Sequence, residues 1–141
     1  AENLALDRQV RTIDGVHFAG LSAGLPFGGC PYERTEEEYT VAIAELSAYL
    51  PGVGGLGPTI LVSHQPPHDT LCDVSRGAHV GSTTIRQFIL DREPDLVLCG
   101  HIHESVGDDR LGASRVVNPG PWFAGNLLRM HASTNGIEIL D

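Results

Sequence analysis

Hydrophobic and polar residues alternate with different periods along the chain, and these periods predict a series of strands and helices. Residues 8–22 contain two short apolar runs joined at Asp14-Gly15, a dipeptide typical of a tight hairpin turn. Residues 59–65 and 94–100 are short and almost continuously apolar, which is typical of strands buried on both faces. Three further runs predict strands near the end of the chain, at residues 113–120, 126–132 and 136–140.

The first predicted helix follows Thr35, which with Glu38 fits the pattern of a capping box. Apolar residues three and four apart continue from there until Pro51-Gly52 stops the helix. The glutamates at 36–38 suit the positive end of the helix dipole. We therefore expect this acidic run to be a solvated helix start and not a metal cluster.

A second helix is predicted between Ser82 or Thr83, either of which can cap it, and Pro94, before which it ends. Strand, loop, helix and strand in this order form a βαβ unit, so the strands at 59–65 and 94–100 should be parallel. The fold class is therefore α/β. The polar loop at 66–81 is long, and loops of this length are often functional.

Length and charge restrict the classes of function. The 141 residues suit one domain, residues 1–141. Nine basic and 18 acidic residues give a net charge of −9, which argues against nucleic acid as a partner. Apolar runs are too short for a membrane span. The three cysteines, which are Cys30, Cys72 and Cys99, form no CxxC pair, so we expect a reducing, cytoplasmic location.

Three histidines follow the two strands of the predicted βαβ unit. His64 comes directly after the first strand, and His101 and His103 come directly after the second. Ligands bind beyond the carboxyl ends of parallel strands, and neutral imidazole is a frequent transition-metal ligand. We therefore predict a metal site at this sheet edge, either a mononuclear three-histidine zinc site or a two-metal site that clamps a phosphoryl group.

Carboxylate ligands for a two-metal site are few in this sequence. Asp69 and Asp73 lie in the long loop, and Asp108 and Asp109 follow the histidines in what looks like a surface turn. A negative net charge does not exclude a phosphate substrate, because bound cations supply positive charge locally.

Four segments together resemble the second half of a calcineurin-like metallophosphoesterase, in particular the small prokaryotic phosphoesterases of that superfamily. In chain order they read ILVSHQPP, GAHVGS, DLVLCGHIH and LGASRVVNPG, and their order and spacing agree over about residues 10–141. The resemblance implies two packed β-sheets flanked by helices. It also implies that His64 and His101 bind one divalent ion and His103 a second. Mn, Fe, Zn, Ni and Co all suit such mixed histidine and carboxylate sites.

The blocks with which this family opens are absent from the first ten residues. They are Asp-x-His, Gly-Asp-x-x-Asp and Gly-Asn-His-Asp/Glu, and they supply the remaining metal ligands and the histidine thought to protonate the leaving group. We therefore expect the chain to be the C-terminal half of a larger metallophosphoesterase domain, or a divergent protein that has lost the chemistry. No residue of this chain is assigned as catalytic.

Several residues are candidates for contact with a substrate. His79 and His68 lie in the long loop, and Asn118 ends a predicted strand near the same sheet edge. Asn118 equally suits a turn-capping role before Pro119. Trp122 and Phe123 either line the mouth of the site or pack in the core.

The resemblance thus implies a phosphoesterase that acts on small-molecule phosphate mono- or diesters with two divalent ions. Two alternatives remain at this point: an inactive metallophosphoesterase-like scaffold or binding module, and a mononuclear three-histidine zinc enzyme. A homo-oligomer is left open.

Overall fold

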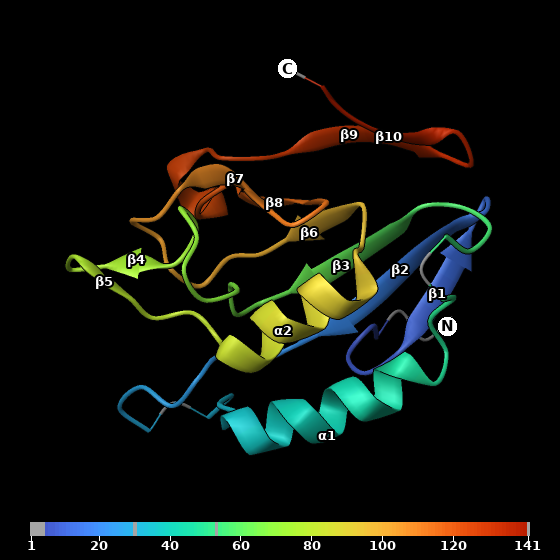
Figure 1. Ribbon diagram of the computed structural model, residues 1–141. Coiled ribbons are helices and arrows are strands. Elements are labelled where there is room, and N and C mark those ends of the chain that lie inside the picture. Colours follow the sequence, from blue (N-terminus) through green and yellow to red (C-terminus); the bar gives the residue numbers. More distant parts are fainter. Residues whose placement is uncertain (1–4, 30, 53, 141) are drawn as a thin grey trace.

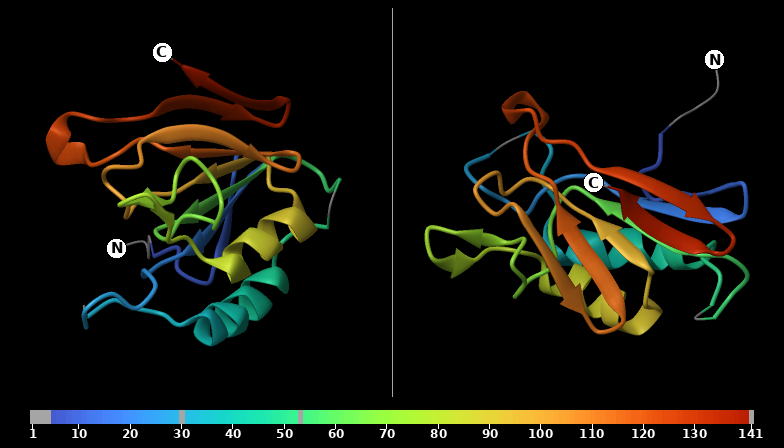
Figure 2. Two further views of the ribbon diagram at one scale, coloured as in Figure 1. Left: turned by 60° about the vertical axis from the view of Figure 1, so that its left-hand side comes forward. Right: turned by 90° about the horizontal axis from the view of Figure 1, so that it is seen from above.

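A central sheet with two helices on one face and a β-hairpin on the other forms the body of the molecule (Figures 1 and 2). The computed structural model describes residues 5–29, 31–52 and 54–140. Its helices are α1 (Glu36–Ser47), α2 (Thr83–Arg92) and the short 3-10 helix η1 (Trp122–Ala124). Its strands are β1 (Val10–Ile13), β2 (Val16–Leu21), β3 (Thr59–Ser63), β4 (Val74–Ser75), β5 (Ala78–His79), β6 (Leu96–Leu98), β7 (Gly107–Leu111), β8 (Ser114–Asn118), β9 (Arg129–Ser133) and β10 (Gly136–Leu140).

The central sheet has six strands in the order β1-β2-β3-β6-β8-β7. The hairpin predicted at Asp14-Gly15 joins β1 to β2, with both turn residues at positive φ. Strand β3 pairs with β6 in parallel, and α2 lies between them in the chain. The α/β fold class and the βαβ unit are therefore confirmed.

Strand β7 was not predicted from the sequence, and the interpretation of Asp108 and Asp109 as a surface turn is wrong. Both lie in β7, which pairs antiparallel with β8 at the edge of the sheet. The Asp108 carboxylate accepts hydrogen bonds from Arg115 on β8. Asp109 Oδ2 accepts a hydrogen bond from the backbone N–H of Leu71, 2.8 Å away. An edge strand with charged, solvated side chains lacks the apolar pattern that reveals central strands.

Helix α1 begins as predicted and ends earlier than predicted. Thr35 is its N-cap, and the capping box with Glu38 is present in both directions. The helix ends at Ser47, so Tyr49 is not part of its buried face and is 72% exposed.

The acidic start of α1 is not wholly solvated, because Glu36 caps the neighbouring helix. Its carboxylate accepts hydrogen bonds from the hydroxyl of Ser82 at 2.6 Å and from the backbone N–H groups of Thr83 and Thr84 at 2.8 and 3.2 Å. Burial alone would raise the pKa of Glu36, but these hydrogen bonds outweigh it and the pKa is lowered. The carboxylate thus joins the start of α1 to the start of α2.

Replacing Glu36 with alanine is expected to destabilise the protein by about 1–2 kcal/mol, the usual effect of losing a helix cap with charged hydrogen bonds. The Glu37→Ala variant is the control, since Glu37 is exposed in the same turn. Because folding lowers the pKa of Glu36, its contribution is present above the ordinary pKa of 4.5 and is lost as the pH falls through the folded value. Urea unfolding at pH 7 and pH 3 measures both effects. Equal unfolding midpoints for the two variants at pH 7 would contradict the capping role.

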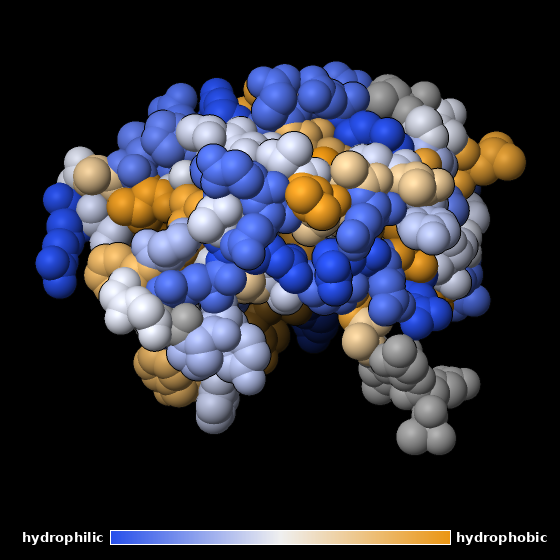
Figure 3. Space-filling view, turned by 90° about the horizontal axis from the view of Figure 1, so that it is seen from below, coloured by the Kyte–Doolittle hydropathy of each residue, from blue (hydrophilic) through white to orange (hydrophobic). Residues whose placement is uncertain are grey.

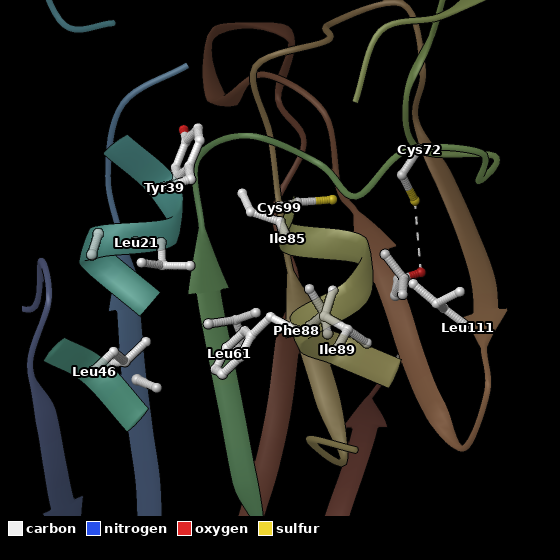
Figure 4. Packing of buried hydrophobic residues seen from close by; sticks show 14 residues of the cluster. Leu21, Tyr39, Leu46, Leu61, Cys72, Ile85, Phe88, Ile89, Cys99 and Leu111 are labelled. Carbon is white, nitrogen blue, oxygen red and sulfur yellow. Dashed lines mark hydrogen bonds between the residues drawn. The ribbon is translucent and has the colours of Figure 1, made fainter. Parts of the chain in front are cut away.

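Two hydrophobic clusters fill the two interfaces of the sheet. The larger lies between the sheet and the helices, where side chains of α1 and α2 meet those of the strands (Figure 4). The smaller comprises Val16, Ile60, Leu96 and Val117 of the sheet, against which residues of the β9–β10 hairpin pack. The outer surface of the molecule seen from below, the side on which α1 lies in Figure 1, is mostly polar, with several separate hydrophobic patches (Figure 3).

Two further expectations concern membranes and cysteines. No helix in the described part of the chain is long and apolar enough to cross a bilayer. Cys72 and Cys99 are buried free thiols, and Cys30 lies outside the described residues.

Candidate functional site

The site forms where β3 and β6 end side by side. His64 directly follows β3, and its backbone N–H donates to the carbonyl of Leu21 at the end of β2. Its own carbonyl accepts a hydrogen bond from the N–H of Gly100, beyond the end of β6. The sheet pairing is thereby extended past the strand ends, which brings His64 next to His101. His64 Nε2 lies 3.0 Å from His101 Nδ1, and the two ring centroids are 4.7 Å apart.

His101 is held in a backbone conformation that few residues adopt. Its φ is 65°, in the left-handed region that costs a non-glycine residue about 1 kcal/mol or more. Its ring lies against Gly24, where an added Cβ would be 2.9 Å from Nε2. The close approach of this ring therefore depends on glycine at position 24.

The spacing of the two imidazole nitrogens suits a shared metal ion. Two nitrogens bound to one ion at about 2.0–2.1 Å lie about 3.0–3.4 Å apart, and His64 and His101 meet this condition. Burial and the charges of neighbouring histidines lower the pKa of His64, and burial and His103 lower the pKa of His101. Both shifts favour the neutral imidazole, which is the form that binds metals.

His103 does not join the other two histidines at one point. It is exposed and its ring packs edge-on against Phe123, with centroids 5.4 Å apart. Within residues 5–29, 31–52 and 54–140, no three His, Cys, Asp or Glu side chains are arranged to hold an ion. The structure therefore brings together two of the three predicted ligands, and it does not show the mononuclear three-histidine arrangement.

Asn118 holds the turn that carries the histidines. It is buried at the end of β8, and its Nδ2 donates to the carbonyls of Ile102 and Ser105, each at 2.9 Å. Its Oδ1 accepts the N–H of Gly120 at 3.0 Å. These bonds correspond to the turn-capping interpretation of Asn118. They also use its Nδ2 and Oδ1, the atoms with which the side chain would otherwise contact a substrate.

His79 and His68 lie together in the long loop, with ring centroids 5.7 Å apart. His79 Nδ1 is 2.7 Å from Oδ1 of Asp73, a fully buried carboxylate that also accepts backbone N–H groups of Thr70 and Gly81. Burial alone would raise the pKa of Asp73, but these bonds outweigh it and lower the pKa, while Asp73 raises the pKa of His79. Asp73 is thus committed to holding the loop. A substrate contact by either histidine stays a prediction.

Gln65 is a residue of the site that the sequence did not single out. It is buried next to His64, its Oε1 accepts the N–H of Leu25 at 2.9 Å, and its Nε2 donates to the carbonyl of Val80 at 2.8 Å. It therefore ties two loops together beside the histidine pair. Its place directly after His64 was the one signal available in the sequence.

A carboxylate also lies near His64 but is not free. Asp7 and His64 line the same cavity of about 590 Å³, whose other walls are largely apolar. Arg34 donates to both oxygens of Asp7, at 3.0 and 2.7 Å. These hydrogen bonds hold the pKa of Asp7 well below its ordinary value, so the carboxylate is engaged as an ion pair.

The sequence of the chain is similar to those of known proteins. A family described as "Metallophosphoesterase, calcineurin superfamily" matches residues 57–139. The uncharacterized protein MJ1162 of Methanocaldococcus jannaschii is 38% identical over 125 residues, which cover 84% of this chain and 54% of that protein.

Solved structures show the same fold. One crystal structure aligns with 96% of this chain and 53% of its own, with a TM-score of 0.71 at 16% identity. The crystal structure of TT1561 of Thermus thermophilus aligns with 96% of this chain and 58% of its own, with a TM-score of 0.56 at 22% identity. The chain thus spans little more than half the length of these relatives.

Proposed function

The chain belongs to the calcineurin superfamily of metallophosphoesterases, and from this premise we propose that it carries the histidine part of an active site that hydrolyses phosphate mono- or diesters. The family supports a phosphoesterase function in general. The proposal adds a centre with two divalent ions, small-molecule substrates and a division of the site between this chain and residues outside it.

One observation carries the proposal: the 3.0 Å separation of His64 Nε2 and His101 Nδ1 at the ends of two parallel strands. The lowered pKa of each ring favours its neutral form, and His64 remains exposed beside the cavity. Without an ion the same 3.0 Å contact is a hydrogen bond between the two rings, which holds the pair at a spacing that fits one ion.

The roles of the residues follow from their positions. His64 and His101 would hold one ion, and His103 would hold the other. Asn118 fixes the turn that carries His101 and His103. The ions would supply Lewis acidity and an activated water for attack on phosphorus. His79 and His68 are proposed to contact the phosphate group from the long loop.

Residues outside this chain are proposed to complete the centre. Two neutral imidazoles leave the charge of a divalent cation uncompensated, and Asp7 and Asp73 are both engaged elsewhere. The largely apolar cavity beside His64 offers a surface on which a further segment could pack. The chain also spans only about half the length of its relatives.

Hydrolysis of bis-p-nitrophenyl phosphate with Mn²⁺ tests the proposal. A protein extended upstream of Ala1 is expected to turn over the substrate, to stop when EDTA is added and to bind two ions by elemental analysis. The isolated 141-residue chain is expected to show little turnover and weak metal binding. Robust turnover by the isolated chain would contradict the divided site, and an inactive, metal-free extended protein would favour the scaffold alternative.

A further inference from the structure

Two large aromatic side chains stand exposed next to the histidine turn. Trp122 is 83% exposed and Phe123 is 66% exposed. Their rings meet edge to face at 6.4 Å, and the Phe123 ring meets the His103 ring at 5.4 Å. A continuous row of rings therefore leads from a candidate metal ligand outward to solvent.

The turn that carries the two rings is fixed at both ends. Asn118 Oδ1 accepts the N–H of Gly120, and an added Cβ at Gly120 would lie 2.4 Å from Asn126 and 2.6 Å from Val106. The N–H of Gly125 closes the turn on the carbonyl of Trp122 at 2.9 Å. The backbone of the 3-10 turn that displays the two rings is thus anchored at both ends.

Contiguous exposed apolar surface beside a candidate site is typical of a ligand-binding surface. The edge-on contact of Phe123 with His103 places the two rings beside a candidate metal ligand, so a planar group stacked on them would hold an attached phosphate near the histidines.

We propose, on the basis of the proposed function, that Trp122 and Phe123 bind a planar aromatic group of the substrate, so that the site prefers phosphate esters of aryl groups or nucleosides over alkyl esters. Aromatic stacking provides the recognition. Trp122 and Phe123 are therefore specificity-determining residues and do not act on the reacting atoms.

Matched pairs of ligands test this preference by direct binding to the upstream-extended protein in Mn²⁺. The pairs are phenylphosphonate with methylphosphonate, and adenosine 5′-monophosphate with ribose 5-phosphate, and inorganic phosphate is the reference. We expect the aromatic member of at least one pair to bind about tenfold more tightly. The pair with the larger ratio distinguishes an aryl group from a nucleobase.

The variants separate the rings from the rest of the site. Trp122→Ala and Phe123→Ala should each bring the ratio close to one, and Trp122→Phe should retain part of it. Tyr49→Ala, an exposed aromatic residue beyond the end of α1, should keep the full ratio. Trp122 is the sole tryptophan of the 141 residues. A change in tryptophan fluorescence when ligand is added to the wild type, absent in Trp122→Phe, therefore reports contact between the ligand and this ring.

Two results would overturn the inference: equal affinities within both pairs, or ratios that survive both alanine substitutions. Hydrolysis is assayed separately, so the two proposals can fail independently. An active enzyme without aromatic preference contradicts this inference alone. An inactive protein whose aromatic preference depends on Trp122 contradicts the proposed function alone.

Discussion

Replacing His101 with alanine is expected to reduce metal-dependent phosphoester hydrolysis by at least about 100-fold, because even the loss of an outer-shell partner of a metal ligand costs 10–100-fold. His101 supplies one of the two nitrogens that lie 3.0 Å apart. Isothermal titration with Mn²⁺ and steady-state hydrolysis of bis-p-nitrophenyl phosphate by the upstream-extended protein measure the loss.

The control for this variant is His131→Ala, which removes an exposed imidazole from β9. It should leave hydrolysis and metal affinity within about twofold, since surface substitutions usually have small effects. Thermal unfolding checks that His101→Ala remains folded. A folded His101→Ala variant with wild-type metal affinity and rate would exclude His101 as a ligand.

Replacing Asp73 with asparagine is expected to destabilise the protein by about 3 kcal/mol. The buried carboxylate accepts hydrogen bonds from backbone N–H groups of Asp69, Thr70 and Gly81 and lies 2.7 Å from His79 Nδ1. An amide places a donor against these donors, and disrupting a buried charged network costs about 3–5 kcal/mol. Asp91→Asn is the matched control, because Asp91 is exposed on α2.

The pH dependence of stability provides a second readout of the Asp73–His79 pair. Folding lowers the pKa of Asp73, so its contribution is present above the ordinary pKa of 3.8 and is lost as the pH falls through the folded value. Folding raises the pKa of His79, so its contribution is complete below 6.5 and is lost as the pH rises through the folded value. The pair should therefore stabilise the protein most between these limits.

Urea unfolding of wild type, Asp73→Asn and Asp91→Asn from pH 3 to pH 9 tests both statements. The Asp73→Asn variant should be less stable than wild type. Its free energy of unfolding should also change less with pH at the two limits given above. An unchanged profile in Asp73→Asn would show that the pair does not hold the loop.

The sequence predicted those parts of the fold that depend on local signals. The Asp14-Gly15 turn, the Thr35 capping box and the apolar runs of β3 and β6 each act over a few residues. Strand β7 escaped prediction because its sequence is largely charged and only its pairing with β8 makes it a strand. The role of Glu36 escaped because its partners are 46 to 48 residues away.

In the candidate site, too, the features that follow from a simple rule were predicted and those that depend on distant packing were not. The approach of His64 to His101 follows from the rule that parallel strands end together. Gln65 and Asn118 depend on which loops pack over the strand ends, and no pattern along the chain encodes that packing. Asn118 could be placed at the correct edge from the sequence, but only its two carbonyl partners reveal what it holds.

The left-handed backbone of His101 affects which residues this position should accept in related sequences. Glycine or asparagine would occupy φ 65° with less strain than histidine. For the stability of the fold alone, either residue would therefore be preferred at position 101. A lineage that no longer needs the imidazole should drift toward glycine or asparagine here while retaining the turn. Histidine at position 101 in a descendant sequence would then indicate continued use of the ring, and its loss would mark the point at which that use ended.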